Sequence, residues 1–229
     1  MKTMKLTIAC VMLAALASCN KDNDIEMRLT HQQKESFGEN ISGQYAGQLI
    51  VTYTNKDSKV TTDEEGHRSI EAYRETFENV HFDVSGYKMH HLLLQDFPVS
   101  LIAKVVDADA ALSQALASTA PIAVTASYDF GYNTDYSHIN WAFTPNVMPL
   151  SLNYGGEEHH ILIEFNNNSQ YYTFSQDELK QPEAFRSIAH QGINLQLQAI
   201  YDGTTLVQRF NSADDNYMHI TFKIPANTQ

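Results

Sequence analysis

Short stretches of alternating apolar and polar residues, separated by tight-turn residues, constrain the fold of this chain more than any other feature. Residues 43–53 alternate in this way and are rich in aromatic and β-branched side chains, which is typical of a half-buried strand. Gly155-Gly156 and Asp202-Gly203 each stand between two such stretches. Dipeptides of this kind favour type I′ hairpins, because both central residues of that turn need a positive φ. The sequence therefore predicts antiparallel strands joined by hairpins.

The same pattern continues to the end of the chain, with turn residues spread evenly between the apolar stretches. Further strands are expected at residues 75–84, 87–97, 123–132, 139–143, 148–153, 160–165, 171–174, 193–200, 205–210 and 217–224. About ten strands linked by short turns predict a mainly β fold, either an antiparallel sandwich or a calycin-like barrel. Without an internal repeat or linker, a single domain over 41–229 is the simplest organisation, with two β-subdomains as the alternative.

One or two short helical insertions are expected within this β-rich pattern. Pro98 suits a first helical turn and precedes apolar residues on one helical face, and Asp107 or Asp109 can cap a second stretch. Residues 175–178 match a capping box, but Pro182 keeps any helix there short.

The first residues have the three parts of an export signal. Lys2 and Lys5 supply the positive charge, and residues 6–17 form an uninterrupted run of apolar or small residues. This run is too short to span a bilayer, which takes about 20 residues. Cys19 stands where the apolar run meets polar sequence.

The segment Leu16-Ala17-Ser18-Cys19 resembles the lipobox of bacterial lipoproteins. The resemblance implies a signal peptide over 1–18, cleavage before Cys19 and diacylglycerol on the Cys19 sulfur, with palmitate-type chains. Two or more acyl chains anchor a protein stably. We therefore expect export and anchoring in the bacterial outer membrane, facing the periplasm or the cell surface, with residues 19–40 as a polar tether. An ordinary secretory signal with an accidental cysteine is the alternative.

Cysteine usage and charge exclude several classes of function. Cys10 leaves with the signal and Cys19 carries lipid, so the mature fold has no disulfide, thiol nucleophile or cysteine-based zinc site. The chain has 15 basic and 27 acidic residues, a formal net charge of −12, and loss of Lys2 and Lys5 makes it more negative still. Such a surface repels a polyanion, so nucleic acid is excluded as a partner.

The histidines, serines and carboxylates form no established catalytic or metal-binding motif. Gly-x-Ser-x-Gly and His-Glu-x-x-His do not occur. Glu157 and His159 share one strand face and Glu158 and His160 the other, which permits a mixed site, but solvated strand ends explain them as well. Asp107 to Asp109 and residues 211–216 carry oxygen ligands without matching a calcium loop. The sequence thus predicts no catalytic residue, no metal site and no cofactor, and favours a non-enzymatic protein.

An aromatic segment is the strongest candidate for ligand binding. Residues 128–136 interleave tyrosine and phenylalanine with Asp and Asn, ahead of the single tryptophan, Trp141. Flat rings stack on sugar faces while polar groups bind hydroxyls. Tyr132, Tyr136 and Trp141 are therefore candidate ligand-binding residues. The alternative is a strand end whose aromatic side chains, Trp141 above all, fill the core.

The opening strand Gly43-Gln44-Tyr45-Ala46-Gly47-Gln48-Leu49, after a lipobox and tether, resembles uncharacterised β-rich lipoproteins of Bacteroides-type gut bacteria. Gly43-x-Tyr45 is also faintly similar to the Gly-x-Trp opening of lipocalins, with tyrosine in place of tryptophan. Neither resemblance carries a functional residue.

The leading hypothesis is a cell-envelope lipoprotein with a binding or structural role, whose partners are the membrane, through lipid on Cys19, and a glycan or envelope protein. A glycan-processing hydrolase and a calycin-like carrier of a small apolar ligand are the alternatives. Shape discriminates among them: an acid-lined cleft favours the hydrolase, a deep apolar cavity the carrier, and a filled core with a flat aromatic patch the binding module.

Overall fold

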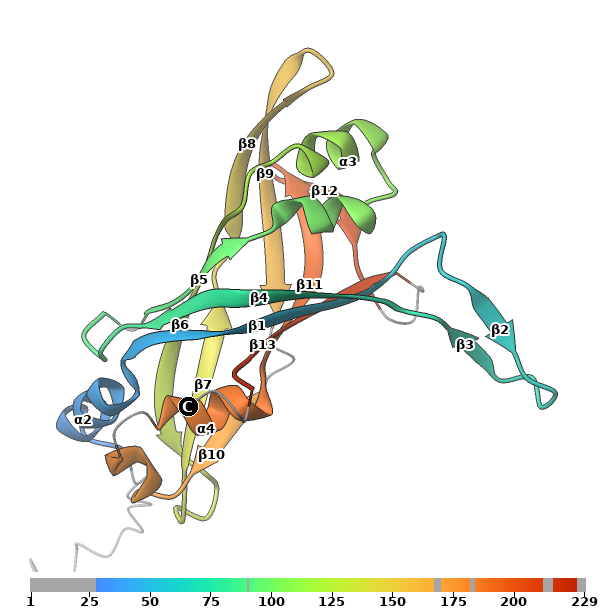
Figure 1. Cartoon of the computed structure of the whole chain (residues 1–229). Helices are drawn as coiled ribbons and strands as arrows, with labels where there is room; N and C mark the ends of the chain where they lie inside the picture. Colours follow the sequence, from blue (N-terminus) through green and yellow to red (C-terminus); the bar gives the residue numbers. More distant parts are fainter. Residues whose placement is uncertain (1–27, 90, 167–169, 182–183, 212–215, 226–229) are drawn as a thin grey trace, which may run out of the picture.

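The structure, a computed structural model, describes residues 28–89, 91–166, 170–181, 184–211 and 216–225. Within these ranges one antiparallel sheet of eleven strands curls strongly into a half-barrel, with short helices at its ends (Figure 1). The prediction of a mainly β, antiparallel fold is confirmed. The predicted signal peptide and Cys19 lie outside the described residues.

The strand order is β10-β7-β6-β5-β4-β1-β13-β11-β9-β8, with β12 paired to β11. The strands are β1 (Gly43–Thr54), β4 (Tyr73–Val84), β5 (His91–Phe97), β6 (Ile122–Tyr132), β7 (Ile139–Pro145), β8 (Met148–Tyr154), β9 (Glu157–Asn166), β10 (Tyr171–Phe174), β11 (Ile193–Asp202), β12 (Thr205–Arg209) and β13 (Tyr217–Lys223).

The connection between β7 and β8 explains why the sheet curls. The two strands follow each other in the chain, yet β7 lies second from one edge of the sheet and β8 forms the other edge. Only residues 146 and 147 join them, a link that spans at most about 11 Å. The two edges must therefore approach each other, and a sheet of this width can do so only by curling.

Two-residue hairpins form at both predicted places, but the second turns one residue later than predicted. Asp202 pairs with Thr205, so Gly203 and Thr204 are its central residues, and only Gly203 of these two has the positive φ expected at both. Gly155 and Gly156 join β8 to β9 with φ values of 64° and 91°, and Gly203, with φ of 57°, lies between β11 and β12. Glycine reaches these left-handed conformations without the steric cost that a Cβ atom imposes.

The described residues contain more helical segments than the one or two expected. These segments are α2 (His31–Ile41), η1 (Val99–Lys104), α3 (Ala110–Ala117), η2 (Glu178–Lys180) and α4 (Phe185–Gln191). Asp109 caps α3 as predicted, with its Oδ1 accepting from the amides of Ala111 and Leu112 at 2.8 and 3.0 Å. The predicted capping box at Ser175 and Glu178 forms, but it leads only into the 3₁₀ turn η2.

The folded part begins earlier than the sequence predicts. Leu29, Phe37 and Ile41 are buried in the core, so the last part of the expected tether belongs to the domain as α2. Thr30 and Gln33 form a capping box at the start of this helix. The sequence indicates at most one helical turn, near residues 27–34, because Phe37 is the only large apolar residue between His31 and Asn40.

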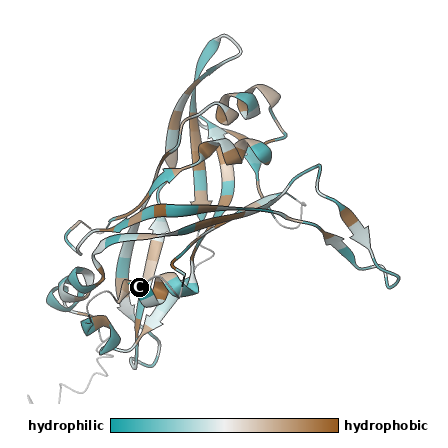
Figure 2. Cartoon of the chain, viewed as in Figure 1, coloured by the Kyte–Doolittle hydropathy of each residue, from teal (hydrophilic) through white to brown (hydrophobic). Residues whose placement is uncertain are grey.

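Large side chains fill the concave interior of the half-barrel. Trp141, Phe97, Phe185 and Phe222 are among the largest side chains that are less than 2% exposed. Hydrophobic and hydrophilic residues alternate along the strands (Figure 2), as expected when one face of a sheet packs and the other meets solvent. The described residues thus form a filled core.

A helical cap, defined as η1 and α3 together, covers one end of this interior (Figure 1). The buried side-chain amides of Gln208 and Asn216 fasten the turn between η1 and α3 to the sheet. Gln208 Oε1 accepts from the amides of Asp107 and Ala108 at 3.0 and 3.1 Å, and Gln208 Nε2 donates to the Val105 carbonyl at 2.9 Å. Asn216 Nδ2 donates to the same carbonyl at 3.0 Å.

An arm projects from the half-barrel between β1 and β4 (Figure 1). It is the small hairpin β2 (Val60–Thr62) and β3 (Arg68–Ile70), which pairs with no other described strand. None of the described helices combines the length and apolar character that a membrane span requires.

Candidate ligand-binding groove

Trp141 is a core residue, which is the alternative to the ligand-binding role predicted from the sequence. Its side chain is 0% exposed, and its ring packs at 5.5–5.9 Å from the rings of Phe143, Tyr172 and Phe185. A ring enclosed in this way cannot stack on a ligand. The expected sugar platform therefore lacks its tryptophan.

Tyr132 and Tyr136 do come together at the tip of the β6–β7 hairpin. Their rings meet edge to face at 5.9 Å, and both border a hollow of about 390 Å³ together with Arg28 and Lys34. Tyr136 is 39% exposed. Lys34 is occupied by an ion pair with Asp129 at 2.8 Å. Because the two tyrosine rings meet edge to face, they do not form a flat platform for a sugar.

One histidine of the β8–β9 hairpin has a partner distant in sequence. His159 Nδ1 lies 2.6 Å from Asp202 Oδ2, and its ring stacks on Tyr154 with centroids 3.8 Å apart. The hydrogen bond to Asp202 raises the pKa of His159 above its ordinary value. Asp202 lies on β11, which is why adjacent-residue reasoning missed the pair.

One cluster of potential metal ligands occurs among the described residues. Asp63, Glu65 and His67 bring their ligand atoms within 4.8 Å of one another at the exposed tip of the arm. Asp63 Oδ1 is already occupied by the amides of Glu65 and His67. Of the two oxygen-rich segments, residues 212–215 lie outside the described residues, and Asn216 donates to Asp107 Oδ2 at 3.3 Å, a bond that helps to hold the cap in place.

A different pair of aromatic residues forms a flat, fixed platform at the root of the arm. Tyr53 on β1 and Tyr73 on β4 are directly opposite in the strand register, and their rings stack with centroids 5.3 Å apart and planes 26° apart. Tyr53 is buried, whereas Tyr73 is 43% exposed. The Tyr73 hydroxyl donates to the Asp57 carbonyl at 3.2 Å. One face of the Tyr73 ring is thus backed and its edge tethered, while the residue stays open to solvent.

Charged groups lie beside this platform. Glu75, two residues after Tyr73 and on the same strand face, accepts through Oε1 from the Tyr53 hydroxyl at 3.0 Å and from Lys104 Nζ of the cap. The Lys104 ammonium also lies 5.7 Å from the centre of the Tyr53 ring. Burial and then the Glu75 carboxylate raise the pKa of Tyr53, and the hydrogen bond to Glu75 raises the pKa of Lys104. At neutral pH the site therefore contains a neutral phenol and a paired cation.

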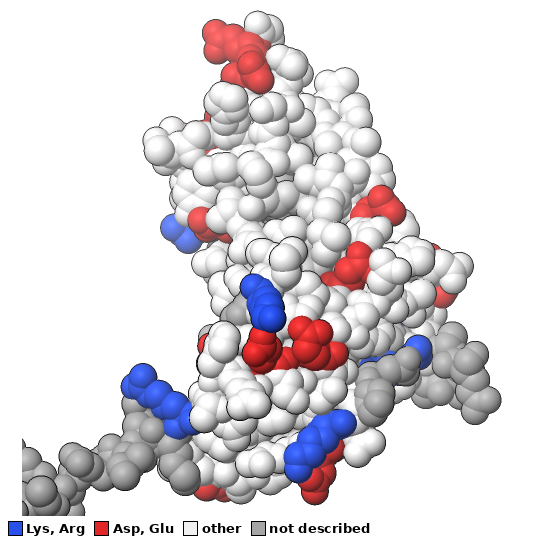
Figure 3. All heavy atoms as spheres, turned by 90° about the vertical axis from the view of Figure 1, so that its left-hand side faces the viewer, with Lys and Arg blue, Asp and Glu red and all other residues white. Residues whose placement is uncertain are grey.

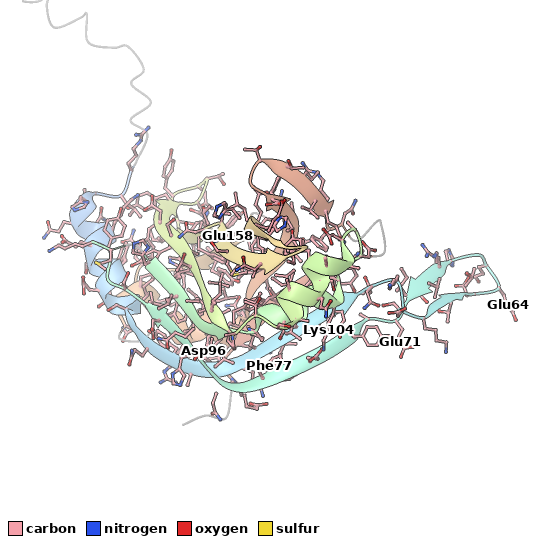
Figure 4. All side chains as sticks on the ribbon, turned by 90° about the horizontal axis from the view of Figure 1, so that it is seen from above. Glu64, Glu71, Phe77, Asp96, Lys104 and Glu158 are labelled. Carbon is pink, nitrogen blue, oxygen red and sulfur yellow. The ribbon has the colours of Figure 1, made fainter. Side chains whose placement is uncertain are left out.

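Two adjoining hollows extend from these residues along the edge of the cap; we call them together the Tyr73 groove. The first, of about 350 Å³, is bordered by polar residues that include Asn55 and Asp57 as well as Tyr53 and Tyr73. The second, of about 540 Å³, is bordered by apolar residues that include Phe77, Pro98 and Leu101. Ala103, Lys104 and Ser113 border both. Figure 4 shows Phe77 and Lys104 on one side of the molecule, with Glu64 at the far end of the arm.

The walls of the groove are fastened by hydrogen bonds that do not depend on a ligand. Asn55 Nδ2 donates to the Lys104 carbonyl at 2.8 Å, which ties the root of the arm to the cap. Ser113 Oγ donates to the Ala103 carbonyl at 2.9 Å, which ties α3 to η1. Preformed walls reduce the ordering cost of binding.

Sequence analysis missed this groove because its residues come from separate segments. The arm separates Tyr53 from Tyr73, and Lys104 lies on a helix whose position depends on tertiary packing. The available signal was the aromatic residue at each end of the turn-rich segment 54–72. Such a pair would face each other if that segment were a hairpin insertion.

Comparison with known proteins places this chain in a family. The searches of curated proteins and of solved structures find no match. A family model described as a domain of unknown function (DUF4840) matches residues 40–190, which is more than half of the chain. The matched segment includes the Tyr73 groove, α3 and the β8–β9 hairpin. The chain therefore belongs to the DUF4840 family.

Proposed function

We propose that this protein is a lipid-anchored module of the bacterial cell envelope that binds carbohydrate in the Tyr73 groove without chemically changing it. The observation that carries the proposal is the Tyr73 ring, which is 43% exposed, stacked on Tyr53 and flanked by a charged pair. Sugar rings have apolar C–H faces and polar edges, so they fit a flat aromatic ring with hydrogen-bonding groups beside it.

The filled core favours a surface site over a carrier of an apolar ligand. An enclosed carrier needs an interior hollow, whereas the inward side chains of this half-barrel are packed against one another. The described residues thus favour the binding module over the calycin-like carrier.

The electrostatics of the groove favour binding over hydrolysis. Glycoside hydrolysis needs one protonated carboxylic acid and a second, opposed carboxylate. Glu75 is paired with the Lys104 ammonium and accepts from the Tyr53 hydroxyl, so it is held in place as a hydrogen-bond acceptor. It remains well suited to accept hydrogen bonds from sugar hydroxyls.

Replacing Tyr73 with alanine should weaken saccharide binding about tenfold or more, equivalent to about 1.4 kcal/mol, because the platform is lost. The free energy of unfolding should change by about 1 kcal/mol or less, since the ring is largely at the surface. A soluble form of the mature chain that begins at residue 20, without the lipidated cysteine, would be screened on a glycan array and the best hit measured by calorimetry.

Two control variants make this result specific. Tyr73→Phe keeps the ring and should keep most of the affinity. Tyr171→Ala removes a ring that is 62% exposed outside the groove and should have no effect. Unchanged affinity in Tyr73→Ala would rule out the platform.

The lipid anchor is tested separately from ligand binding. Cys19→Ala removes the sulfur that accepts diacylglycerol, so labelled palmitate should no longer be incorporated and the chain should leave the membrane fraction. Ser58→Ala, within the folded part, should be labelled like the wild type. Incorporation of label into the Cys19→Ala variant would show that Cys19 is not the lipidation site.

A further inference from the structure

The strand β8 is a free edge of the sheet. It is the last strand in the sheet order and pairs only with β9 among the described strands. Because the turn has two residues, Tyr154 and Glu157 form the closing pair of the hairpin, which is hydrogen-bonded. Pairs without and with mutual backbone hydrogen bonds then alternate along β8 and β9. Ser151 and Asn153 therefore direct their backbone N–H and C=O groups away from β9.

A hydrogen bond on the far side of β9 supports this alternation. His160 is the register partner of Ser151, and its carbonyl accepts from the Gly203 amide at 2.8 Å, in the turn between β11 and β12. At this pair the backbone of β9 thus points away from β8. The matching groups of β8 point to the open edge.

A groove runs along this free edge, with α3 as its opposite wall; we call it the β8 groove. It has a volume of about 500 Å³ and is bordered by four consecutive residues of β8, 151–154, by Ala111 and Ala115 of α3, and by Ser118, which caps the end of that helix. Consecutive strand side chains point to opposite faces. A hollow that all four residues border must therefore face the strand edge, where the backbone groups lie.

The helical wall of the β8 groove is fixed and smooth. Leu112 and Leu116 on the inner side of α3 are 0% exposed, which holds the helix against the core. Apart from Gln114, the side chains of α3 that border the groove are small, so a polypeptide backbone can approach the edge. A fixed helix beside a free strand edge is the arrangement in which extended peptides add to a sheet, gaining main-chain hydrogen bonds.

The charges around the β8 groove define the occupant. Glu157 and Glu158 are exposed on the hairpin at one end, where Figure 3 shows acidic side chains gathered at the top of the molecule and Figure 4 labels Glu158. Asp109 starts the helical wall. The residues that border the groove include no lysine, arginine, aspartate or glutamate, so the acidic residues at its ends set the local charge. A basic segment is therefore favoured over an acidic one.

We propose that an extended, basic segment of a partner protein binds in the β8 groove as an additional strand on β8. Pairing is confined to the stretch after Pro149, because proline has no N–H to offer at the next outward-facing position. The ligand strand thus uses the outward groups of Ser151 and Asn153, which corresponds to about four ligand residues. This site is separate from the Tyr73 groove and does not depend on carbohydrate binding.

The test uses a fluorescent hexapeptide of alternating lysine and valine as the probe, with the mature chain and fluorescence anisotropy. Its counterpart of alternating glutamate and valine should bind at least tenfold more weakly. Asn153→Pro removes an outward N–H without touching the β9 ladder, and Ala115→Phe fills the β8 groove without changing the strand. Each should lower the affinity at least tenfold.

Charge controls separate groove binding from general attraction to an acidic protein. Glu158→Lys should weaken binding severalfold, whereas Glu64→Lys, at the tip of the arm, should leave it unchanged. Amide resonances of Ser151 and Asn153 should shift on peptide addition. Failure of the lysine–valine peptide to bind at 1 mM would overturn the proposal. So would an affinity that neither Asn153→Pro nor Ala115→Phe reduces.

Discussion

Replacing Trp141 with alanine should lower the free energy of unfolding by about 3–5 kcal/mol, the usual cost of removing a large aromatic side chain from a packed core. The ring is 0% exposed and touches aromatic residues from β7, β10 and α4. Removal of the ring leaves a cavity between β7, β10 and α4, and these elements cannot all move in to fill it. Urea denaturation of the mature chain, followed by circular dichroism, measures the change.

Tyr136→Ala is the matched control for this experiment, because Tyr136 belongs to the same predicted aromatic segment but is 39% exposed. It should cost about 1 kcal/mol or less. Equal, small losses for both variants would mean that Trp141 is not a core residue, and the aromatic segment would again be a candidate platform.

Replacing Gln208 with leucine should cost about 2–4 kcal/mol. Gln208 is 8% exposed and satisfies the amides of Asp107 and Ala108 and the carbonyl of Val105. Leucine has a similar size but leaves the amides of Asp107 and Ala108 without their partner, whereas the Val105 carbonyl keeps its bond from Asn216. Each buried unsatisfied group costs about 1–3 kcal/mol. Water that enters the loosened turn would reduce the total.

The Gln208 variant should also affect ligand binding, because the cap carries Lys104 and Ser113 of the Tyr73 groove. We expect faster hydrogen exchange at η1 and α3 and weaker saccharide binding. Gln48→Leu is the control, since Gln48 makes its side-chain bonds to an exposed carboxylate, and it should change stability by about 0.5 kcal/mol or less. Identical exchange at the cap in Gln208→Leu and wild type would contradict this role.

Local chemistry made part of the fold predictable from the sequence. Gly155-Gly156 and Asp202-Gly203 predict hairpins because the turn needs positive φ, and both hairpins form, although the second turns at Gly203 and Thr204. Asp109 predicts the start of α3 because its carboxylate can cap the first amides. In each case the deciding interaction lies within a few residues of the chain.

The features that sequence analysis missed depend on distant contacts. Phe185 stabilises α4 by packing against Tyr45, Phe82 and Trp141, which lie on three different strands. No local sequence pattern encodes those partners. The strand order puts β7 and β8 near opposite edges although only two residues separate them. The Tyr53–Tyr73 platform and the His159–Asp202 pair likewise join residues that the chain separates.

The central claim, that the Tyr73 groove is the ligand site, is tested most directly by amide NMR of the mature chain during titration with its best-binding saccharide. We expect the largest shift changes at Tyr73, at Lys104 of η1 and at Ser113 of α3, three segments that meet only at the groove. Changes confined to residues 132–136 of the β6–β7 hairpin, with Tyr73 and Lys104 unmoved, would contradict the claim and place the ligand at the Tyr132–Tyr136 hollow instead.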